Sequence, residues 1–240
     1  ILAKSIPAKK YGVKTGEAVA TALEKCPELI LVKPDFRLYE KSSRAFMELC
    51  RRYTPVVEKY SIDECFLDMT GTENLYQNLH TTAEEIKNTI REKLGFTANI
   101  GIGPNKLLAK MASDFEKPDK VHTLAEEEIP EKLWPLPVGA LFTVGKATAE
   151  KLTNARIESI GDLAHANLKT IQQMLGAKPG WQLWHYANGQ DPSPVLSEPE
   201  ESKGYSISTT LEKDVTTISQ ANTILLSLSD SVSARMRADG

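Results

Sequence analysis

The sequence predicts an α+β fold of ferredoxin-like type in its first half, followed by a helical region. Up to about residue 123, strand-like and helix-like segments alternate, and one pair of strands is expected to form a hairpin. Beyond that point, short helical segments with short connections take over. The chain has 240 residues, 41% hydrophobic and 25% charged, as in a globular protein that can bury a core.

The first half carries clear start and stop signals for its elements. Ser5 can cap a short helix that has Pro7 in its first turn, and Gly12 ends it. Apolar spacing, together with Gly and Pro stop signals, predicts helices over 17–26, 38–53, 82–94 and 106–115, and strands over 29–32 and 97–103.

The predicted hairpin contains two adjacent carboxylates, Asp63 and Glu64, inside an apolar run that continues through Phe66 and Leu67. Burying an ionised carboxylate is expensive unless a cation or a donor compensates it. Neighbours in a regular strand point to opposite faces, so both carboxylates reach one ion only near a strand end, a bend or a bulge. The spacing leaves two interpretations open, a solvated turn and a metal site.

In the second half, helices are predicted over 125–134, 146–154, 160–164, 167–175 and 180–187. Residues 143–152 resemble a helix-hairpin-helix unit, in which a glycine turn at a helix start points backbone N–H groups at a phosphate. Residues 157–163 resemble a second unit, and an ordinary helical hairpin is the competing interpretation of either one. A Pro/Ser/Glu-rich linker precedes a predicted strand over 204–211 and a helix over 219–236.

Composition excludes several classes of protein. Three cysteines without close spacing support neither a disulfide framework nor a zinc site, and they fit a reduced cytoplasmic setting. No apolar run reaches membrane-spanning length and no signal peptide is visible, so no membrane partner is expected. The net charge of −3 gives no general attraction to nucleic acid, and a solvated face is the favoured interpretation of the lysine-rich start. The spacing of Gly101–Lys106 differs from that of a P-loop.

A set of motifs in a fixed order makes the resemblance to a family specific. The motifs are Ser61-Ile62-Asp63-Glu64, then Gly101-Ile102-Gly103-Pro104-Asn105-Lys106 continuing to Asp114, then Lys117-Pro118. Together they resemble the Y family of lesion-bypass DNA polymerases of bacterial type, over essentially the whole chain. The resemblance implies partial fingers at 1–35, a ferredoxin-like palm at 36–124, a helix-hairpin-helix thumb at 125–192, a linker at 193–203 and a truncated α/β little finger at 204–240.

The resemblance also implies roles for individual residues. Asp63 and Glu64 match the catalytic, metal-binding acids, which hold two Mg²⁺ ions in the complete enzymes. Lys117 matches a lysine that contacts the incoming nucleotide, and Lys9 stands where the family usually has an arginine over the phosphates. The expected DNA contacts lie in the first helix-hairpin-helix unit, at Val144, Gly145, Lys146 and Thr148.

The implied function is template-directed, error-prone DNA synthesis past damaged bases, as in SOS mutagenesis and the DNA damage response. Its implied partners are primer–template DNA, deoxynucleoside triphosphates and a sliding clamp bound through a further C-terminal region. The family's N-terminal strand, with the first metal-binding aspartate and the gate against ribonucleotides, has no counterpart after Ile1. We therefore expect these 240 residues to be inactive alone.

Two other classes stay open. A nucleotidyl cyclase can use a palm-like sheet with paired acids, but it needs no thumb for duplex DNA. A non-catalytic DNA-binding module can use the helix-hairpin-helix pair, but it needs neither Asp63 nor Glu64.

Overall fold

The computed structural model describes residues 1–72, 74–76, 78–198 and 203–239. The chain folds as two units, Ile1–Ser197 and Glu198–Gly240. Part of the predicted linker, residues 199–202, lies outside the described residues.

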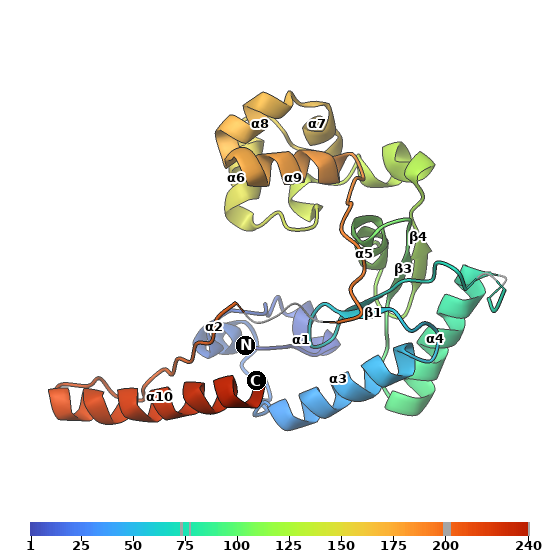
Figure 1. Ribbon diagram of the computed structural model, residues 1–240. Helices are drawn as coiled ribbons and strands as arrows, with labels where there is room; N and C mark the ends of the chain where they lie inside the picture. Colours follow the sequence, from blue (N-terminus) through green and yellow to red (C-terminus); the bar gives the residue numbers. More distant parts are fainter. Residues whose placement is uncertain (73, 77, 199–202, 240) are drawn as a thin grey trace. The chain divides into compact units, whose positions relative to one another are not determined.

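The first unit contains most of the secondary structure (Figure 1). Its strands are all short: β1 (Val57–Lys59), β2 (Cys65–Leu67), β3 (Ile100–Ile102) and β4 (Val121–Thr123). Its α-helices are α1 (Ile6–Lys10), α2 (Val19–Lys25), α3 (Phe36–Cys50), α4 (Leu79–Leu94), α5 (Lys106–Asp114), α6 (Lys146–Asn154), α7 (Ile160–His165), α8 (Leu168–Leu175) and α9 (Ala177–Ala187). Short 3₁₀ and π turns, η1 (Glu126–Glu128), η2 (Ile129–Leu133) and η3 (Val138–Ala140), connect β4 to α6.

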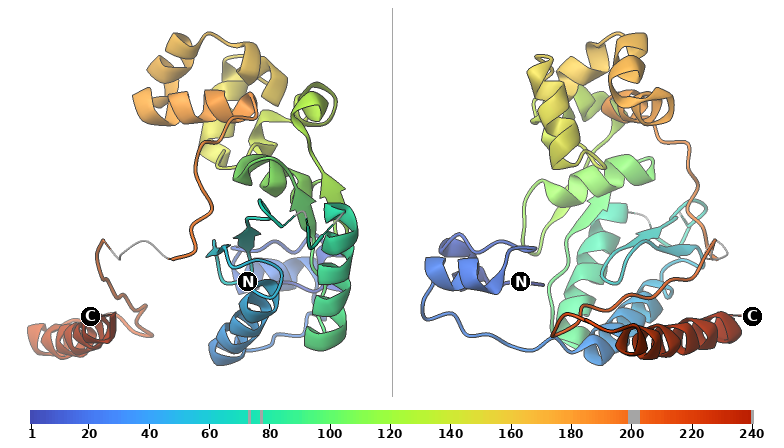
Figure 2. Two further views of the ribbon diagram at one scale, coloured as in Figure 1. Left: turned by 45° about the vertical axis from the view of Figure 1, so that its right-hand side comes forward. Right: turned by 90° about the vertical axis from the view of Figure 1, so that its left-hand side faces the viewer.

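The strands form two pairs. Strands β1 and β2 are antiparallel, with Val57 opposite Leu67 and Lys59 opposite Cys65, which confirms the predicted hairpin. Strands β3 and β4 are parallel and are connected through α5, and both α4 and α5 pack against them (Figures 1 and 2). The combination of helices with paired strands confirms the α+β prediction, although β4 was not foreseen from the sequence.

Helix α5 lies directly on the backbone of β3, and two glycines make this approach possible. A Cβ atom at Gly101 would lie 1.8 Å from the Ala109 carbonyl oxygen and 2.5 Å from the Ser113 nitrogen. A Cβ atom at Gly103 would lie 2.7 Å from the Ala109 nitrogen. Side chains larger than hydrogen are therefore excluded at both positions, and the Gly-Ile-Gly sequence fixes where α5 sits.

Asn105 joins α5 to the helical region. Its Oδ1 atom caps the helix by accepting from the Leu108 N–H at 2.9 Å. Its Nδ2 atom donates to the Gly189 carbonyl oxygen at 2.8 Å, just after α9. One side chain thus ends the β3–α5 turn and fastens it to a segment 84 residues away.

The largest buried core is shared by α5 and the helical region. It joins Leu107, Leu108 and Met111 of α5 to residues of α6–α9 and their connections, including Leu152, Ile160, Leu163, Ile171 and Leu183. Figure 2 shows α6–α9 gathered in one cluster. Smaller cores lie between α3, α4 and the strands, and under α1 and α2.

Two predicted strands are wrong. Residues 29–32 have no regular structure, and Ile30 and Val32 are 87% and 84% exposed. Residues 204–211, in the second unit, are also irregular and pair with no strand among the described residues. Both runs have strand-forming side chains, but a strand needs a partner edge to satisfy its N–H and C=O groups.

The second unit consists mainly of helix α10 (Ile218–Asp239), which confirms the predicted C-terminal helix. Arg235 donates to the Ser206 carbonyl oxygen at 3.4 Å, within the same unit. Among the residues that the structure describes, no helix is both long enough and apolar enough to cross a membrane.

Candidate active site and nucleic-acid interface

The turn between β1 and β2, residues 60–64, carries both predicted acids, and we call it the acid turn. The Glu64 carbonyl oxygen accepts from the Tyr60 and Ser61 N–H groups, both at 3.0 Å, which closes the turn. The Ser61 hydroxyl lies 2.8 Å from Asp63 Oδ1 and 3.5 Å from Glu64 Oε2. The bend thus brings both carboxylates to one hydroxyl group, which neighbours in a regular strand could not reach together.

Helix α5 supplies a lysine that pairs with one of these acids. The Lys110 ammonium pairs with the Glu64 carboxylate and lies 3.4 Å from Asp114 Oδ2. The other oxygen of Asp114 lies 2.5 Å from the Lys117 ammonium. Glu64, Lys110, Asp114 and Lys117 therefore form a line of alternating charges, which we call the ion chain.

The ion chain connects two residues for which the family resemblance implies separate roles, metal binding for Glu64 and nucleotide binding for Lys117. Its middle member Lys110 is the most enclosed, with 15% of its side chain exposed, against 40% for Glu64 and 56% for Lys117. Burial lowers the pKa of Lys110, but Glu64 and Asp114 outweigh it and raise that pKa above the usual value. Lys110 is thus a firmly charged ammonium ion beside the acid turn.

A second lysine of α5 fixes the hairpin from the other side. Lys106 Nζ lies 3.0 and 2.9 Å from the two carboxylate oxygens of Glu58, on β1. Glu58 also accepts from the Leu196 N–H at 2.8 Å, and Lys106 lies over the Phe66 ring, 5.6 Å from its centroid. Lys106 and Lys110 have the same exposed fraction, 15%, but different carboxylate partners.

The acid turn also touches the helical region through aromatic rings. Tyr60 packs edge-on to Phe66, with 5.5 Å between the ring centroids, and lies 5.8 Å from the ring of Phe142. Phe142 is two residues from Val144, so the acid turn and the predicted DNA contacts are linked by one pair of rings.

A pair of thiols lies directly behind the acids. Cys65 Sγ is 3.8 Å from Cys50 Sγ, at the end of α3. The hydrogen bond to Cys50 and burial raise the pKa of the Cys65 thiol strongly, so it is not a reactive thiolate at neutral pH. Sequence spacing could not reveal this pair, because a fold and not a motif brings the two residues together.

The acid turn fits a divalent cation of the hard, oxygen-preferring kind. Asp63 is exposed and Glu64 half-exposed, and carboxylate oxygens are the ligands that Mg²⁺ prefers, with water completing its shell. No group of three or more His, Cys, Asp or Glu side chains in a metal-binding arrangement occurs within the described residues. Two carboxylates are thus the donor set that this part of the chain offers to a metal ion.

The predicted phosphate contacts lie in the turn that leads into α6, residues 141–146, which we call the glycine hairpin. Gly145 is the N-cap and has no capping side chain, and no partner is found for the Gly145 and Lys146 N–H groups within the described residues. Both residues are exposed, with 92% of the Lys146 side chain accessible, and Thr148 is half-buried in the first turn of α6. Such a helix start is suited to an anion.

One of the predicted DNA contacts, Val144, has an occupied backbone donor. The Val144 N–H is not free, because it donates to the Leu141 carbonyl oxygen at 2.9 Å and closes a β-turn. The third residue of that turn, Thr143, has φ of 72°, a conformation that favours glycine and that costs a β-branched residue energy. The free donors of the glycine hairpin therefore begin at Gly145.

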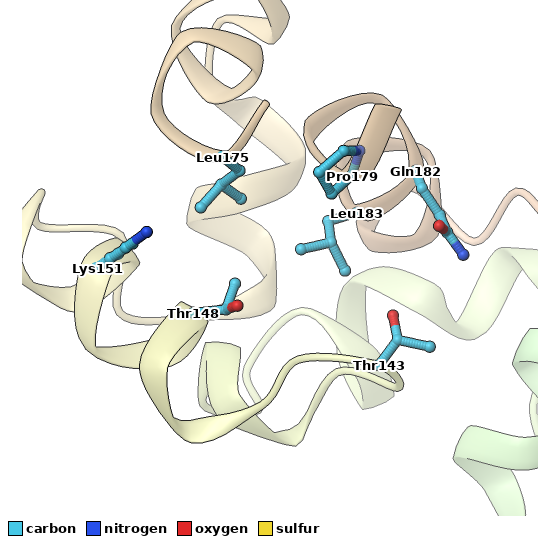
Figure 3. Close-up of a pocket in the computed structure, with 7 residues that line it drawn as sticks. All are labelled: Thr143, Thr148, Lys151, Leu175, Pro179, Gln182 and Leu183. Atoms are coloured by element: carbon cyan, nitrogen blue, oxygen red, sulfur yellow. The ribbon is translucent and has the colours of Figure 1, made fainter. Parts of the chain in front are cut away.

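A pocket of about 220 Å³ lies beside the glycine hairpin (Figure 3). Leu175 and Leu183 form its apolar side, and Thr143, Thr148, Lys151 and Gln182 surround it with polar groups. It is separate from the acid turn and extends the polar surface around the start of α6.

Lys9 stands apart from the other predicted site residues. It is an exposed residue of the short helix α1, and no ion pair or side-chain hydrogen bond is found for it in the described part of the chain. The structure brings Asp63, Glu64 and Lys117 into one charged neighbourhood through Lys110 and Asp114, and it leaves Lys9 outside. The ion pairs of Lys110 and Asp114 were not predicted, although the two residues lie four apart on one face of α5.

A hairpin with paired acids, a helix bearing lysines beside it and a glycine hairpin that offers free amides are the organisation of a polymerase palm and thumb. Comparison with known proteins agrees. Residues 1–114 match the impB/mucB/samB family, and residues 140–191 match a family described as the DNA polymerase-iota thumb domain. Over these matched residues the chain belongs to the Y family of DNA polymerases.

Individual relatives show the same likeness. DNA polymerase IV of Clostridium acetobutylicum is 44% identical over 237 residues, covering 99% of this chain and 59% of the relative. DNA polymerase IV 1 of Bacillus subtilis is 42% identical over 236 residues, covering 97% of this chain and 56% of the relative. The chain thus spans somewhat more than half the length of these curated relatives.

Solved structures agree in fold. The DinB crystal structure from Sulfolobus solfataricus has a TM-score of 0.72 at 30% identity, over 78% of this chain and 55% of that one. An insertion ternary complex of Dbh DNA polymerase has a TM-score of 0.73 at 29% identity, over 80% of this chain and 56% of that one.

Proposed function

We propose that this chain is the catalytic and DNA-holding part of a template-directed DNA polymerase that copies damaged templates with low fidelity. The observation that carries the proposal is the acid turn, where Asp63 and Glu64 meet at the Ser61 hydroxyl and Lys110 of α5 pairs with Glu64. Names of relatives support the same activity, since they are called DNA polymerase IV. Such relatives are bacterial, and we propose a cytoplasmic enzyme of the DNA damage response.

Asp63 and Glu64 are the residues that we propose hold Mg²⁺, with two ions in the complete site. When bound, Mg²⁺ stabilises negative charge on the attacking 3′ oxygen and on the leaving pyrophosphate. The acid turn contributes a bend that aims both carboxylates the same way, and Ser61 restrains them there. Asp63 and Glu64 would hold and orient the metal ions. The remaining metal ligands must come from water, the nucleotide and further protein groups.

Lys117 is the proposed contact to the triphosphate of the incoming nucleotide. Its side chain is 56% exposed, and its ammonium is held by Asp114, which also lies 3.4 Å from Lys110. A triphosphate has more charge than one carboxylate, so it can take Lys117 from Asp114. Lys9 is a further proposed phosphate contact, and as a lysine it offers charge without the bidentate geometry of arginine.

Primer–template DNA is the proposed partner of the glycine hairpin. The N–H groups of Gly145 and Lys146 lie at the start of α6 with no partner within the described residues, and the Lys146 ammonium adds charge. Thr148 can add a hydroxyl from the first turn. Contacts of this kind position a duplex without reading its sequence, which suits an enzyme that copies any template. A sliding clamp is a further proposed partner, on the family resemblance.

The test is primer extension by a chimera in which this chain replaces the matching 237 residues of the Clostridium acetobutylicum DNA polymerase IV. We expect Mg²⁺-dependent extension on undamaged and abasic templates. Asp63→Ala should reduce extension roughly 1,000-fold or more, as loss of a catalytic group does, with DNA affinity within about twofold of the parent. The 240-residue chain alone should bind DNA and extend no primer.

Other outcomes point to other functions. Conversion of a nucleoside triphosphate to a cyclic monophosphate without a primer would indicate a nucleotidyl cyclase. DNA binding without extension by the chimera, unchanged by Asp63→Ala, would indicate a binding module. Robust extension by Asp63→Ala would remove the acid turn from the chemistry.

A further inference from the structure

The ion chain contains two residues, Lys110 and Asp114, to which the proposed polymerase function gives no task. Lys110 lies between two carboxylates, one in the acid turn and one at the end of its own helix. Asp114 in turn lies between two ammonium groups. Both are therefore placed to change partner when a new charge arrives at either end.

We propose that Lys110 is a positioning residue: it holds Glu64 in the absence of metal and moves onto Asp114 when a divalent cation takes Glu64. This inference rests on the proposed role of the acid turn in binding metal. Lys110 is then the counter-ion of Glu64 in the metal-free protein, and Asp114 is the carboxylate with which Lys110 pairs once the metal has bound.

The geometry at Glu64 supports competition for the same carboxylate group. Lys110 occupies Oε1 of Glu64, while Oε2 faces the Ser61 hydroxyl at 3.5 Å. A divalent cation that uses both acids must approach the carboxylate on which the ammonium sits. Two cations on one carboxylate repel each other strongly at a partly buried site, so the ammonium has to withdraw.

Asp114 is a second carboxylate with which the displaced Lys110 ammonium can pair. Its Oδ2 atom is already 3.4 Å from Lys110 Nζ, so a small rotation of the lysine side chain completes that pair. Asp114 also holds Lys117 at 2.5 Å through its other oxygen. Arrival of Lys110 adds a second positive charge to Asp114, which weakens its hold on Lys117 and frees that residue for a triphosphate.

Without the exchange, the ion chain would be a static set of ion pairs that fixes α5 to the hairpin. The two accounts differ in what they predict for metal affinity. A static lysine that merely shapes the acid turn would make metal binding weaker when it is removed. A competing lysine makes metal binding tighter when it is removed.

The experiment uses Mn²⁺ binding to the 240-residue chain, followed by the loss of the free-ion electron paramagnetic resonance signal. Lys110→Met should tighten Mn²⁺ binding roughly tenfold, because the carboxylate no longer has to release an ammonium ion. Lys106→Met is the matched control, with equal exposure and a glutamate partner outside the acid turn, and it should change binding by less than about twofold. Lys110→Gln is a second neutral variant in case the methionine variant fails to fold.

Asp114→Asn separates partner exchange from simple loss of negative charge. It should weaken Mn²⁺ binding severalfold in the wild-type background, since Lys110 then has nowhere to move. In the Lys110→Met background the same change should have little effect. A plain charge effect would give equal weakening in both backgrounds and would overturn the proposal, as would Mn²⁺ binding that is unchanged or weaker in both Lys110 variants.

Asp63→Asn distinguishes failure of the proposed metal site from failure of the partner exchange at Lys110. If Mn²⁺ binding does not depend on Asp63, the proposed metal site itself is wrong and the role of Lys110 falls with it. If binding depends on Asp63 but not on Lys110, the metal site stands and only the partner exchange is refuted.

Discussion

The acid turn and the glycine hairpin present different atoms to their proposed ligands. The acid turn offers side-chain carboxylates, each already engaged by a hydroxyl or an ammonium group. The glycine hairpin offers backbone N–H groups that have no partner within the described residues. The first therefore depends on residue identity and on compensating charge, whereas the second depends on backbone shape.

The largest expected effect concerns the packing that supports the acid turn. Gly101→Ala should destabilise the protein by about 3 kcal/mol or more, because the new methyl group meets the α5 backbone at 1.8 Å. Chemical unfolding followed by circular dichroism measures the loss. Gly145→Ala is the control from the glycine hairpin, where a Cβ atom meets nothing within 4 Å, and it should be nearly neutral. Equal effects of the two changes would contradict the contrast between the sites.

The next effect isolates a backbone donor. Proline is tolerated at the first position of a helix, and Gly145 before it has the extended φ of −81° and ψ of 168° that proline requires. Lys146→Pro removes both charge and N–H, whereas Lys146→Ala removes the charge alone. DNA should bind the proline variant roughly tenfold more weakly than the alanine variant, as expected for one charge-assisted hydrogen bond of about 1.5–3 kcal/mol.

Fluorescence anisotropy with a labelled duplex measures this difference. Lys169→Ala, an exposed lysine of α8, serves as the charge control. Equal affinities of the proline and alanine variants would show that the amide does not contact DNA.

A smaller effect tests strain in the glycine hairpin. Thr143 has φ of 72°, which costs an L-residue about 1–2 kcal/mol, and glycine recovers part of this after its own loss of chain entropy. Thr143→Gly should therefore stabilise the helical region by roughly 0.5–1 kcal/mol. The three tryptophans of the chain, Trp134, Trp181 and Trp184, all lie there, so their fluorescence reports its unfolding. A destabilised glycine variant would mean that the Thr143 side chain makes a compensating contact.

The smallest expected effect is the pH dependence of the stability that Asp162 contributes. Hydrogen bonds from the backbone and side chain of Ser159 and from the Glu158 N–H hold the pKa of Asp162 below its ordinary value of 3.8. A depressed pKa contributes stability that is present above the ordinary value and is lost as the pH falls through the lowered one. Asp162→Asn should thus be less stable than the parent at pH 7, and the gap should narrow below about pH 4. Tryptophan fluorescence in urea at several pH values checks this, and a gap that widens in acid would contradict it.

Sequence reasoning was accurate where the chain itself carries the signal. Caps and stops such as Ser5 and Gly12 marked the ends of helix α1, and the strand formers around Asp63 and Glu64 predicted the hairpin. It failed where the outcome depends on a distant partner. Residues 29–32 have strand-forming side chains but no edge to pair with, so the strand predicted there does not form. Strand β4, which was not predicted, has only three residues and forms by pairing with β3.

The same limit applies to the site. The acids could be found because two adjacent carboxylates in an apolar run are unusual in themselves. The partner of Lys110 could not be found, because Glu64 lies 46 residues away and only packing of α5 on β3 joins them. The occupied N–H of Val144 was hidden because Thr143 adopts a turn conformation that its residue type disfavours.

The most direct test measures primer extension and DNA affinity side by side in the chimera that carries Asp63→Asn or Lys146→Pro. We predict that Asp63→Asn loses extension at every DNA concentration while binding DNA normally. Lys146→Pro should bind DNA more weakly and recover extension as the DNA concentration rises. If Asp63→Asn extends primers like the parent, the acid turn does not carry the chemistry. If saturating DNA fails to rescue Lys146→Pro, the glycine hairpin does not act by binding DNA.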